Sequence, residues 1–221
     1  MQNLTDQIIK AGYSDKTLTE KQLARILGGS SQRRYGLVNR ALKAKELVRV
    51  QRGLYLLADD YRKSSIHPFC IAQALHQGSY VSFETALAYH NWIPEAVYVT
   101  ASVIRENRFS KLDHDALGLF TFTPLAIHKK YYLELVERVQ LNGQTMLIAK
   151  PVRALMDLIC NRKFEWMGIE WLEQNLRIDH EKLVSIKIDD ITTLNLVYKH
   201  KRVRHFLSEF EQALKKEQNH D

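Results

Sequence analysis

Residues 30–57 read SSQRRYGLVNRALKAKELVRVQRGLYLL, and this stretch predicts a basic helix followed by a short β-hairpin. Apolar side chains recur in its first half at three- and four-residue intervals, so they share one stripe of a helix. We expect this buried stripe to consist of Tyr35, Val38, Ala41 and Leu42. Residues 47–50 and 54–57 are strand-like runs joined by Gln51-Arg52-Gly53, a connection typical of a hairpin. A helix followed by a tight hairpin is the second half of a winged helix-turn-helix.

The preceding residues supply the first half of this motif. Residues 3–12 carry apolar side chains at helical spacing, and Thr19 is a suitable N-cap for a second helix over 20–27. Gly28-Gly29 then ends that helix, because glycine adopts turn conformations without steric cost. Ser30 or Ser31 caps the third helix. The order helix, turn, helix, hairpin therefore fills about 57 residues, the size of a compact winged-helix domain.

The charge of the chain is distributed unevenly. The 221 residues carry a formal net charge of +7 at pH 7. Residues 1–57 hold eleven Lys and Arg against four Asp and Glu, whereas the remaining residues hold 21 of each sign. The whole excess thus coincides with the element whose exposed helix fits a DNA major groove, which favours nucleic acid as the partner.

The outward side of the third helix contains the residues that we expect to read bases. Arginine pairs bidentately with guanine, and asparagine or glutamine pairs with adenine. We assign this role to Gln32, Arg33 and Asn39. Gly36 lies on the same side, where it weakens the helix but lets the backbone approach a partner closely.

Other polar residues of this region suit contacts with the DNA backbone. Arg34, Arg40 and Lys43 are expected to hold phosphates, which would fix the register and add salt-dependent affinity. Arg52, at the hairpin tip, is placed to reach a neighbouring minor groove or a phosphate. The predicted DNA-binding set is Ser31, Gln32, Arg33, Arg34, Asn39, Arg40, Lys43 and Arg52.

A hydrophilic passage over residues 58–65 suggests a domain boundary. We expect a winged helix-turn-helix over residues 1–62 and a larger mixed α/β domain with an antiparallel sheet over 63–221, an α+β fold overall. The clearest hairpin of the second domain joins strands over 133–141 and 144–149 through Asn142-Gly143, which suits a type I′ turn. Residues 199–205, KHKRVRH, form a basic patch that either touches DNA backbone or is a solvated helix start.

Several classes of protein are disfavoured by what the sequence lacks. No apolar run approaches the roughly 18 residues that a membrane span needs, and the first residues show no signal-peptide core, so we expect a cytoplasmic protein. Cys70 and Cys160 have no metal-ligand spacing, and we expect them to be buried, reduced thiols.

No enzyme signature stands out either. Ser82, Glu84 and His90 are close in sequence, but no GxSxG elbow surrounds a serine, and the nine histidines lack HExxH spacing. Walker-type and GxGxxG loops are missing, so we expect neither a catalytic site nor a metal or cofactor site. A nuclease alternative would rest on Glu134, Glu137 and Lys150 around the predicted hairpin. A further alternative is a ligand-responsive winged-helix regulator.

Three blocks of the sequence resemble a known family. They are RGLYLL at 52–57, YVSFETALAYHNWIPEAVYVTAS at 80–102 and IAKPVRALMDLI at 148–159. In this order they resemble the antitoxin of AbiE-type (type IV) toxin–antitoxin systems, which act in phage defence. The resemblance implies a winged helix that binds inverted repeats in its own promoter, as a monomer or weak dimer paired on double-stranded DNA, and represses the operon. It also implies a C-terminal domain that counters a nucleotidyltransferase-type toxin without binding it tightly.

Overall fold

The computed structural model describes residues 3–141 and 143–218, so Asn142 of the predicted hairpin turn lies outside the described residues. The chain divides into two compact units. The first contains the residues up to Gln77 together with the short segments His114–Leu117 and Gln140–Gln144, and the second contains the rest. The boundary that the sequence suggested, after residue 62, falls within the first unit.

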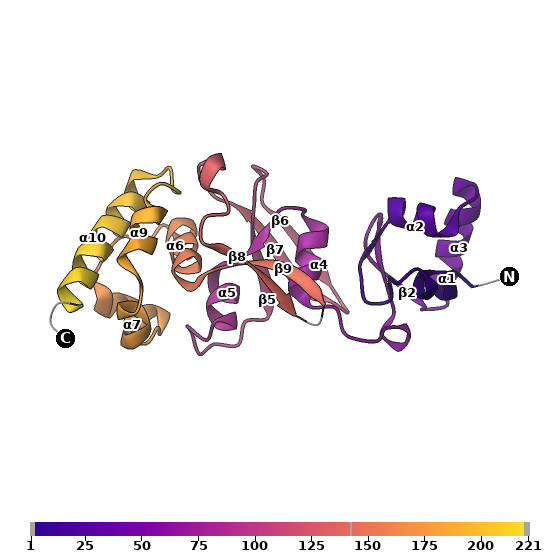
Figure 1. The fold of residues 1–221 in the computed structure, drawn as a ribbon, viewed down its shortest axis with the longest axis horizontal. Helices are drawn as coiled ribbons and strands as arrows, with labels where there is room; N and C mark the ends of the chain where they lie inside the picture. Colours follow the sequence, from indigo (N-terminus) through magenta and orange to yellow (C-terminus); the bar gives the residue numbers. More distant parts are fainter. Residues whose placement is uncertain (1–2, 142, 219–221) are drawn as a thin grey trace. The chain divides into compact units, whose positions relative to one another are not determined.

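The first unit combines short helices with a small antiparallel sheet (Figure 1). Its elements are α1 (Leu4–Lys10), β1 (Leu18–Thr19), α2 (Glu20–Leu27), α3 (Ser31–Lys43), β2 (Leu47–Gln51), β3 (Leu54–Leu57), a 3-10 turn at Asp59–Tyr61 and α4 (Pro68–Leu75). The strands lie in the order β1-β3-β2, with Tyr55 of β3 opposite both Leu18 and Arg49. The hairpin therefore packs against the strand that precedes α2.

The helix starts are fixed by the caps that the sequence predicted. The Thr19 hydroxyl accepts a hydrogen bond from the backbone N–H of Gln22, and the Gln22 side chain accepts one from the N–H of Thr19, a reciprocal capping box. Of the two candidate serines, Ser30 caps α3, because its hydroxyl accepts from the N–H of Arg33. Gly28 and Gly29 join the helices with φ of 56° and 69°, values that glycine adopts without strain.

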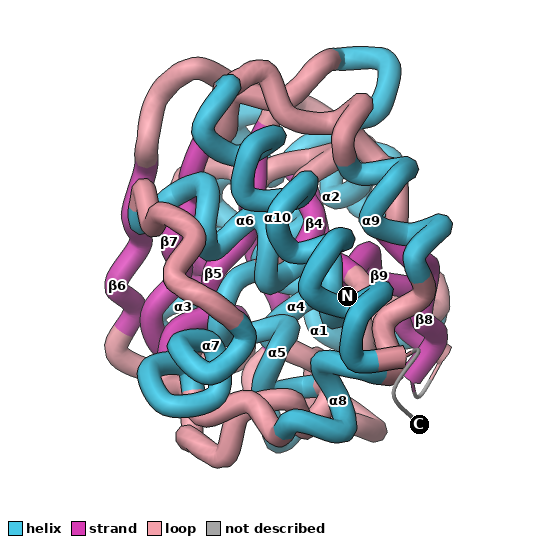
Figure 2. The backbone as a smooth tube through the Cα atoms, turned by 90° about the vertical axis from the view of Figure 1, so that its left-hand side faces the viewer, coloured by secondary structure: helices cyan, strands magenta, loops and turns pink. Residues whose placement is uncertain are grey.

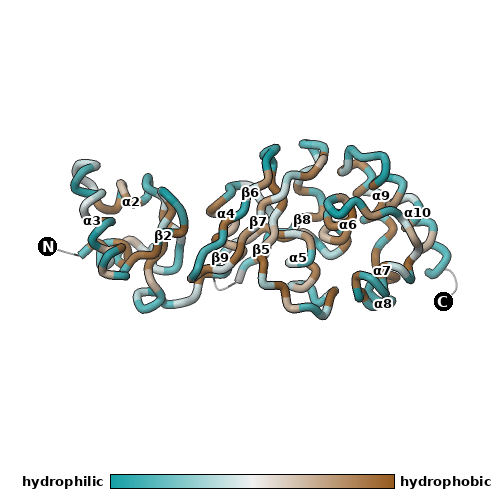
Figure 3. The backbone as a smooth tube through the Cα atoms, turned by 180° about the vertical axis from the view of Figure 1, so that it is seen from behind, coloured by the Kyte–Doolittle hydropathy of each residue, from teal (hydrophilic) through white to brown (hydrophobic). Residues whose placement is uncertain are grey.

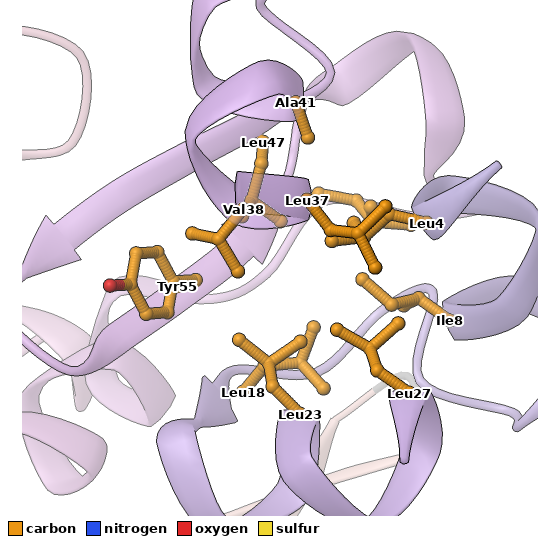
Figure 4. Packing of buried hydrophobic residues seen from close by; sticks show 11 residues of the cluster. Leu4, Ile8, Leu18, Leu23, Leu27, Leu37, Val38, Ala41, Leu47 and Tyr55 are labelled. Atoms are coloured by element: carbon orange, nitrogen blue, oxygen red, sulfur yellow. The ribbon is translucent and has the colours of Figure 1, made fainter. Parts of the chain in front are cut away.

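The core of the first unit gathers mainly leucine and isoleucine side chains from α1, α2, α3 and the sheet (Figure 4). Helix α3 contributes Leu37, Val38 and Ala41, whereas Leu42 is only partly buried. The prediction that Tyr35 belongs to the buried stripe was wrong, because 70 % of Tyr35 is exposed. Since α3 is rotated to insert Leu37 into the core, Tyr35 turns toward the solvent side.

The second unit is built on a six-stranded sheet. Its elements are β4 (Tyr80–Val81), α5 (Phe83–Tyr89), β5 (Val99–Ile104), β6 (Ser110–His114), β7 (Gly118–Pro124), a 3-10 turn at Lys129–Tyr131, β8 (Val136–Leu141), β9 (Gln144–Ala149), α6 (Pro151–Arg162), α7 (Ile169–Leu176), α8 (His180–Val184), α9 (Ile188–Leu194) and α10 (Lys201–Glu217). The strand order is β6-β7-β5-β4-β9-β8, and Figure 2 shows β6 and β8 at opposite edges. Helices α5 and α6 contact each other, and α6 also contacts α9 and α10 (Figure 1).

This sheet is mixed, which corrects the prediction of an antiparallel one. Strands β4 and β5 are antiparallel, but β5 pairs in parallel with β7 from Val99↔Leu119 to Ile104↔Pro124, and β4 pairs in parallel with β9. The pairing is parallel because β7 lies between β5 and the edge strand β6 and runs in the same direction as β5. The predicted α+β class is confirmed, and no helix among the described residues is long and apolar enough to span a bilayer.

Candidate nucleic-acid interface

The outward face of α3 presents four polar side chains. Gln32, Arg40 and Lys43 are exposed, and Asn39 is half-buried beside them. Within residues 3–141 and 143–218, none of the four forms a side-chain hydrogen bond or ion pair. The alternation of hydrophilic and hydrophobic residues along α3 is visible in Figure 3. Two amide groups and two cations are therefore available on one helical face for a ligand.

Arg33 and Arg34 lie at the start of the same helix but bind the preceding turn. The Arg33 guanidinium donates a 2.9 Å hydrogen bond to the carbonyl oxygen of Leu27, and the Arg34 guanidinium donates to the carbonyl oxygen of Gly29. A Cβ atom at Gly29 would lie only 3.0 Å from Arg33 Nη1, so the Arg33 side chain packs directly over this glycine. In this structure both arginines stabilise the α2–α3 turn.

Gly36 lies in the middle of α3, where glycine costs helix stability relative to alanine. A Cβ atom there would meet no other atom within 4 Å. Neither a left-handed backbone nor crowding within the described residues therefore requires glycine at this position. The residue leaves a flat, side-chain-free spot between the polar residues of the outward face.

Tyr35 is the exposed residue of this region that sequence reasoning missed. It lines a groove of about 270 Å³, together with Ser31 and Arg34 of α3, Glu20 at the start of α2 and Tyr55 of β3. The three- and four-residue spacing was compatible with two rotations of α3, and Tyr35 is buried in only one of them. A phenol at this position adds an amphipathic contact group next to Ser31.

The hairpin tip is held against the start of α2. The backbone N–H of Glu20 donates a 3.1 Å hydrogen bond to the carbonyl oxygen of Gly53, whose φ is 82°. Arg52 is exposed beside it, as predicted, without a hydrogen bond or ion pair in the described part of the chain. Arg49 packs its guanidinium 5.9 Å from the ring centroid of Tyr55. The groove is thus lined by the start of α2, by α3 and by strand β3 of the hairpin.

The three side chains of the conceivable serine-dependent site form no hydrogen bond or ion pair with one another among the described residues. The Ser82 hydroxyl is buried and donates to Asp157, whereas Glu84 forms an exposed ion pair of 2.8 Å with Arg162. His90 ends α5, and its Nε2 lies 3.0 Å from the carbonyl oxygen of Ala149. Each of the three side chains has a different partner.

The three residues of the nuclease alternative, Glu134, Glu137 and Lys150, also have different structural roles. The carbonyl oxygen of Glu134 accepts a hydrogen bond from Arg153, the Glu137 carboxylate lies 3.8 Å from His90, and Lys150 is the N-cap of α6. Among the described residues, no group of three or more His, Cys, Asp or Glu side chains is arranged to hold a metal ion.

A buried ionic network occupies the centre of the second unit. Asp157 is fully buried and accepts four side-chain hydrogen bonds, from Arg153 Nε (3.0 Å), Tyr198 (2.7 Å), Tyr80 (2.9 Å) and Ser82 (2.7 Å). Burial, followed by the nearby Asp157 charge, raises the pKa of both Tyr80 and Tyr198, so both phenols stay neutral donors. Burial alone would lower the pKa of Arg153, but the Asp157 carboxylate raises it overall.

This network explains two of the three sequence blocks noted above, because Tyr80 and Ser82 come from one block and Arg153 and Asp157 from another. With no solvent access to the Arg153 and Asp157 side chains, the network holds the fold together and offers no binding surface.

No protein-family model matches the chain, and a search of curated proteins likewise returns no match.

Proposed function

We propose that this chain is a sequence-specific DNA-binding protein whose first unit is a winged helix-turn-helix. The proposal is supported by the element order α1, β1, α2, α3, β2, β3 and by the antiparallel sheet that carries the hairpin. In such a domain α3 enters the major groove and the hairpin follows the adjacent backbone. The observation that carries the proposal is the outward face of α3, where polar and cationic side chains form no hydrogen bond or ion pair with the residues that the structure describes.

The chemistry of this face assigns a role to each side chain. Gln32 and Asn39 supply the amide groups that pair with adenine, and Arg40 and Lys43 supply cations for phosphates. Lys21 and Arg25 on α2 and Arg52 on the hairpin are exposed too, and they would extend the phosphate contacts on either side of α3. Arg33 and Arg34 act indirectly, because they fix the turn that orients α3.

The biological role that we propose follows from the resemblance to AbiE-type antitoxins. The chain would bind inverted repeats in its own promoter as paired copies, repress its operon in the cytoplasm and counter a nucleotidyltransferase-type toxin without forming a tight complex. On this view the second unit is the antitoxin part, and the chain itself performs no catalysis.

The DNA-binding proposal is tested with a duplex that contains the inverted repeats of the gene's own promoter. We expect Arg40→Ala with Lys43→Ala to weaken binding and to lower the slope of log K against log salt by about 2, since each phosphate contact contributes about 0.9. Asn39→Ala should weaken binding to the promoter more than binding to a scrambled duplex, because it removes a base contact worth about 1–3 kcal/mol.

A matched control removes the same charge elsewhere in the first unit. Lys10→Ala with Lys63→Ala changes two exposed lysines that lie outside α3. This control should bind the promoter nearly as well as the unmodified chain. Equal affinities for promoter and scrambled DNA, unaffected by changes on α3, would refute the proposal. The antitoxin role is tested separately, by co-expression with a nucleotidyltransferase encoded beside this gene and measurement of growth.

A further inference from the structure

The second unit contains a cavity of about 590 Å³ that the proposed DNA binding does not use. It lies where the parallel strands β5 and β7 end, since Ile104 and Pro124 are the last residues of these strands and are paired with each other. Ligands of open sheets with parallel strands commonly bind outside the carboxyl ends of those strands. The volume falls within the range of roughly 300–1,000 Å³ that is typical of small-molecule sites.

The cavity has an apolar wall and a cationic rim. Ile104, Pro124 and Ile127 belong to the apolar wall. Arg105, Lys129 and Lys199 supply three positive charges, against the single carboxylate of Glu106. Lys129 and Lys199 are exposed, and neither side chain has a hydrogen bond or ion pair within the described residues. The cavity therefore favours an anion that also has an apolar or planar part.

The fold brings these cations together from segments far apart in sequence. Ile127 and Tyr198 form an isolated antiparallel bridge, and the backbone N–H of Lys199 donates to the carbonyl oxygen of Ala126. In this register Lys199 lies opposite Ala126, and the backbone N–H of His128 donates to the carbonyl oxygen of Val197, so the bridge holds the segment before Lys129 beside the segment before Lys199, and both lysines line the cavity. The sequence indicated Lys199 as part of a basic patch, but it did not indicate that Lys129 lines the same cavity.

The exposed guanidinium group of Arg105, which packs over the buried ring of Tyr132, gives the cavity a surface suited to a planar ring. The guanidinium carbon of Arg105 lies 4.5 Å from the ring centroid of Tyr132. Tyr132 itself is held in place, because its hydroxyl donates a 2.9 Å hydrogen bond to the carbonyl oxygen of Val103 and its ring packs edge-on against Tyr80. Arginine planes and aromatic rings are the surfaces on which proteins stack nucleobases.

We propose that this cavity is a binding site for a nucleoside phosphate. The phosphate groups bind Lys129 and Lys199, and the base lies on the apolar wall beside the Arg105–Tyr132 pair. The proposal is independent of DNA binding by the first unit, because every residue that lines the cavity belongs to the second unit. It assigns the second unit a small-molecule ligand in addition to its proposed antitoxin role.

Calorimetric titration of the full chain with AMP, ATP and inorganic pyrophosphate tests the site. We expect AMP or ATP to bind with one site per chain, and more tightly than pyrophosphate, which lacks the planar part. Lys129→Ala and Lys199→Ala should each weaken nucleotide binding about tenfold, the loss expected for one charge-assisted hydrogen bond of about 1.4 kcal/mol.

Lys130→Ala is the matched control. Lys130 follows Lys129 directly but does not line the cavity, and its Nζ lies 5.4 Å from the ring centroid of Tyr131. This variant should keep its nucleotide affinity within about twofold, well inside the tenfold step of 1.4 kcal/mol. Circular dichroism of each variant verifies that the fold is retained.

Three outcomes would overturn the assignment. One is the lack of binding of all three probes at millimolar concentration. Another is nucleotide binding that is unchanged in both Lys129→Ala and Lys199→Ala, which would place the ligand elsewhere. The third is a loss of affinity for duplex DNA in Lys129→Ala and Lys199→Ala while the unmodified chain binds no nucleotide. The cationic rim would then be a contact with the DNA backbone.

Discussion

The guanidinium group of Arg33 donates a 2.9 Å hydrogen bond to the main-chain carbonyl oxygen of Leu27. Leu27 is the last residue of α2 and Arg33 lies in the first turn of α3, so this bond fixes the angle between the two helices. The carbonyl groups at the end of a helix have no partner within the helix, and Arg33 satisfies one of them. An arginine that the sequence places on the DNA-reading face thus has a structural partner as well.

Arg33→Ala should therefore reduce stability as well as DNA binding. Loss of the bond to Leu27 is expected to lower the free energy of unfolding by about 0.5–1.5 kcal/mol. Arg40→Ala removes an exposed cation of the same helix that has no hydrogen bond or ion pair in the described part of the chain, so it should leave stability unchanged while weakening promoter binding. Urea unfolding and fluorescence anisotropy on both variants separate the two roles. Identical behaviour of the two variants in both assays would contradict this division.

Gly36→Ala should have opposite effects on stability and on binding. Alanine replaces glycine in the helix interior, and the added methyl group meets no atom within 4 Å, so the free energy of unfolding should rise by about 0.5–1 kcal/mol. If the DNA backbone approaches α3 at this spot, the same methyl group weakens promoter binding. Thermal unfolding with and without promoter DNA measures both effects. An affinity equal to that of the unmodified chain would show that Gly36 is not a point of close approach.

Asp157→Asn should destabilise the second unit strongly. The substitution leaves the Arg153 cation buried without its counter-charge, and breaking a buried pair in this way costs about 3–5 kcal/mol. Glu84→Gln is the control, because it breaks the exposed pair with Arg162 and should cost less than about 1 kcal/mol. Chemical unfolding of both variants checks the contrast. Similar losses in the two variants would show that the buried network is not the stronger contributor.

The stability of the first unit should decrease as the pH falls below neutral because of His67. The Nδ1 atom of His67 accepts a hydrogen bond from the N–H of Phe69 at the start of α4, and burial lowers the pKa of His67 below its ordinary value near 6.5. The unfolded chain therefore binds the proton more readily than the folded chain. The contribution of His67 is complete above the unfolded-state pKa, and it is lost as the pH falls through the folded-state pKa.

The variant His67→Asn retains an N-cap acceptor but does not titrate. Its free energy of unfolding should fall less between pH 7.5 and pH 5.5, values that span the ordinary histidine pKa of about 6.5, than that of the unmodified chain. His205→Asn changes a side chain that is 71 % exposed and serves as the control. An equal pH dependence in the unmodified chain and in His67→Asn would count against this assignment.

The two cysteines should differ in reactivity. The sequence predicted that both thiols are buried, but only Cys160 is, and Cys70 is half-buried. Burial raises the pKa of Cys160 to about 11, which suppresses the reactive thiolate at neutral pH. Iodoacetamide at about pH 8 should modify Cys70 before Cys160 in the folded chain, and both at similar rates in urea. Mass spectrometry of the peptides reports the order, and faster modification of Cys160 in the folded chain would contradict its burial.

Local signals in the sequence were sufficient for the helix boundaries of the first unit. Thr19 and Ser30 cap α2 and α3 through bonds that span only three residues, so their roles depend on neighbours in the chain. The rotation of α3 about its own axis could not be predicted from such local signals. Whether Tyr35 or Leu37 faces inward depends on how α3 packs against α1 and α2, and this packing is not a property of the helix sequence.

Long-range arrangements could not be predicted either, because they depend on packing between segments that are distant in the sequence. Arg153 and Asp157 are four residues apart, a spacing that is common on exposed helix faces, and their burial depends on Tyr80 and Tyr198 from distant segments. The parallel pairing of β5 with β7 depends on a strand insertion that alternating apolar residues do not reveal. The same holds for the cavity rim, whose cations are spread over residues 105–199.

The four donors that meet at Asp157 also constrain the order of events during protein synthesis. Tyr80 and Ser82 are synthesised before Asp157, whereas Tyr198 is synthesised 41 residues after it. A chain that stops before Tyr198 leaves the Asp157 carboxylate with three of its four donors, and loss of one hydrogen-bond partner of a buried group costs about 1–3 kcal/mol. The network around Asp157 is therefore complete only after Tyr198 has been synthesised, and a chain truncated before residue 198 should be less stable than the full chain.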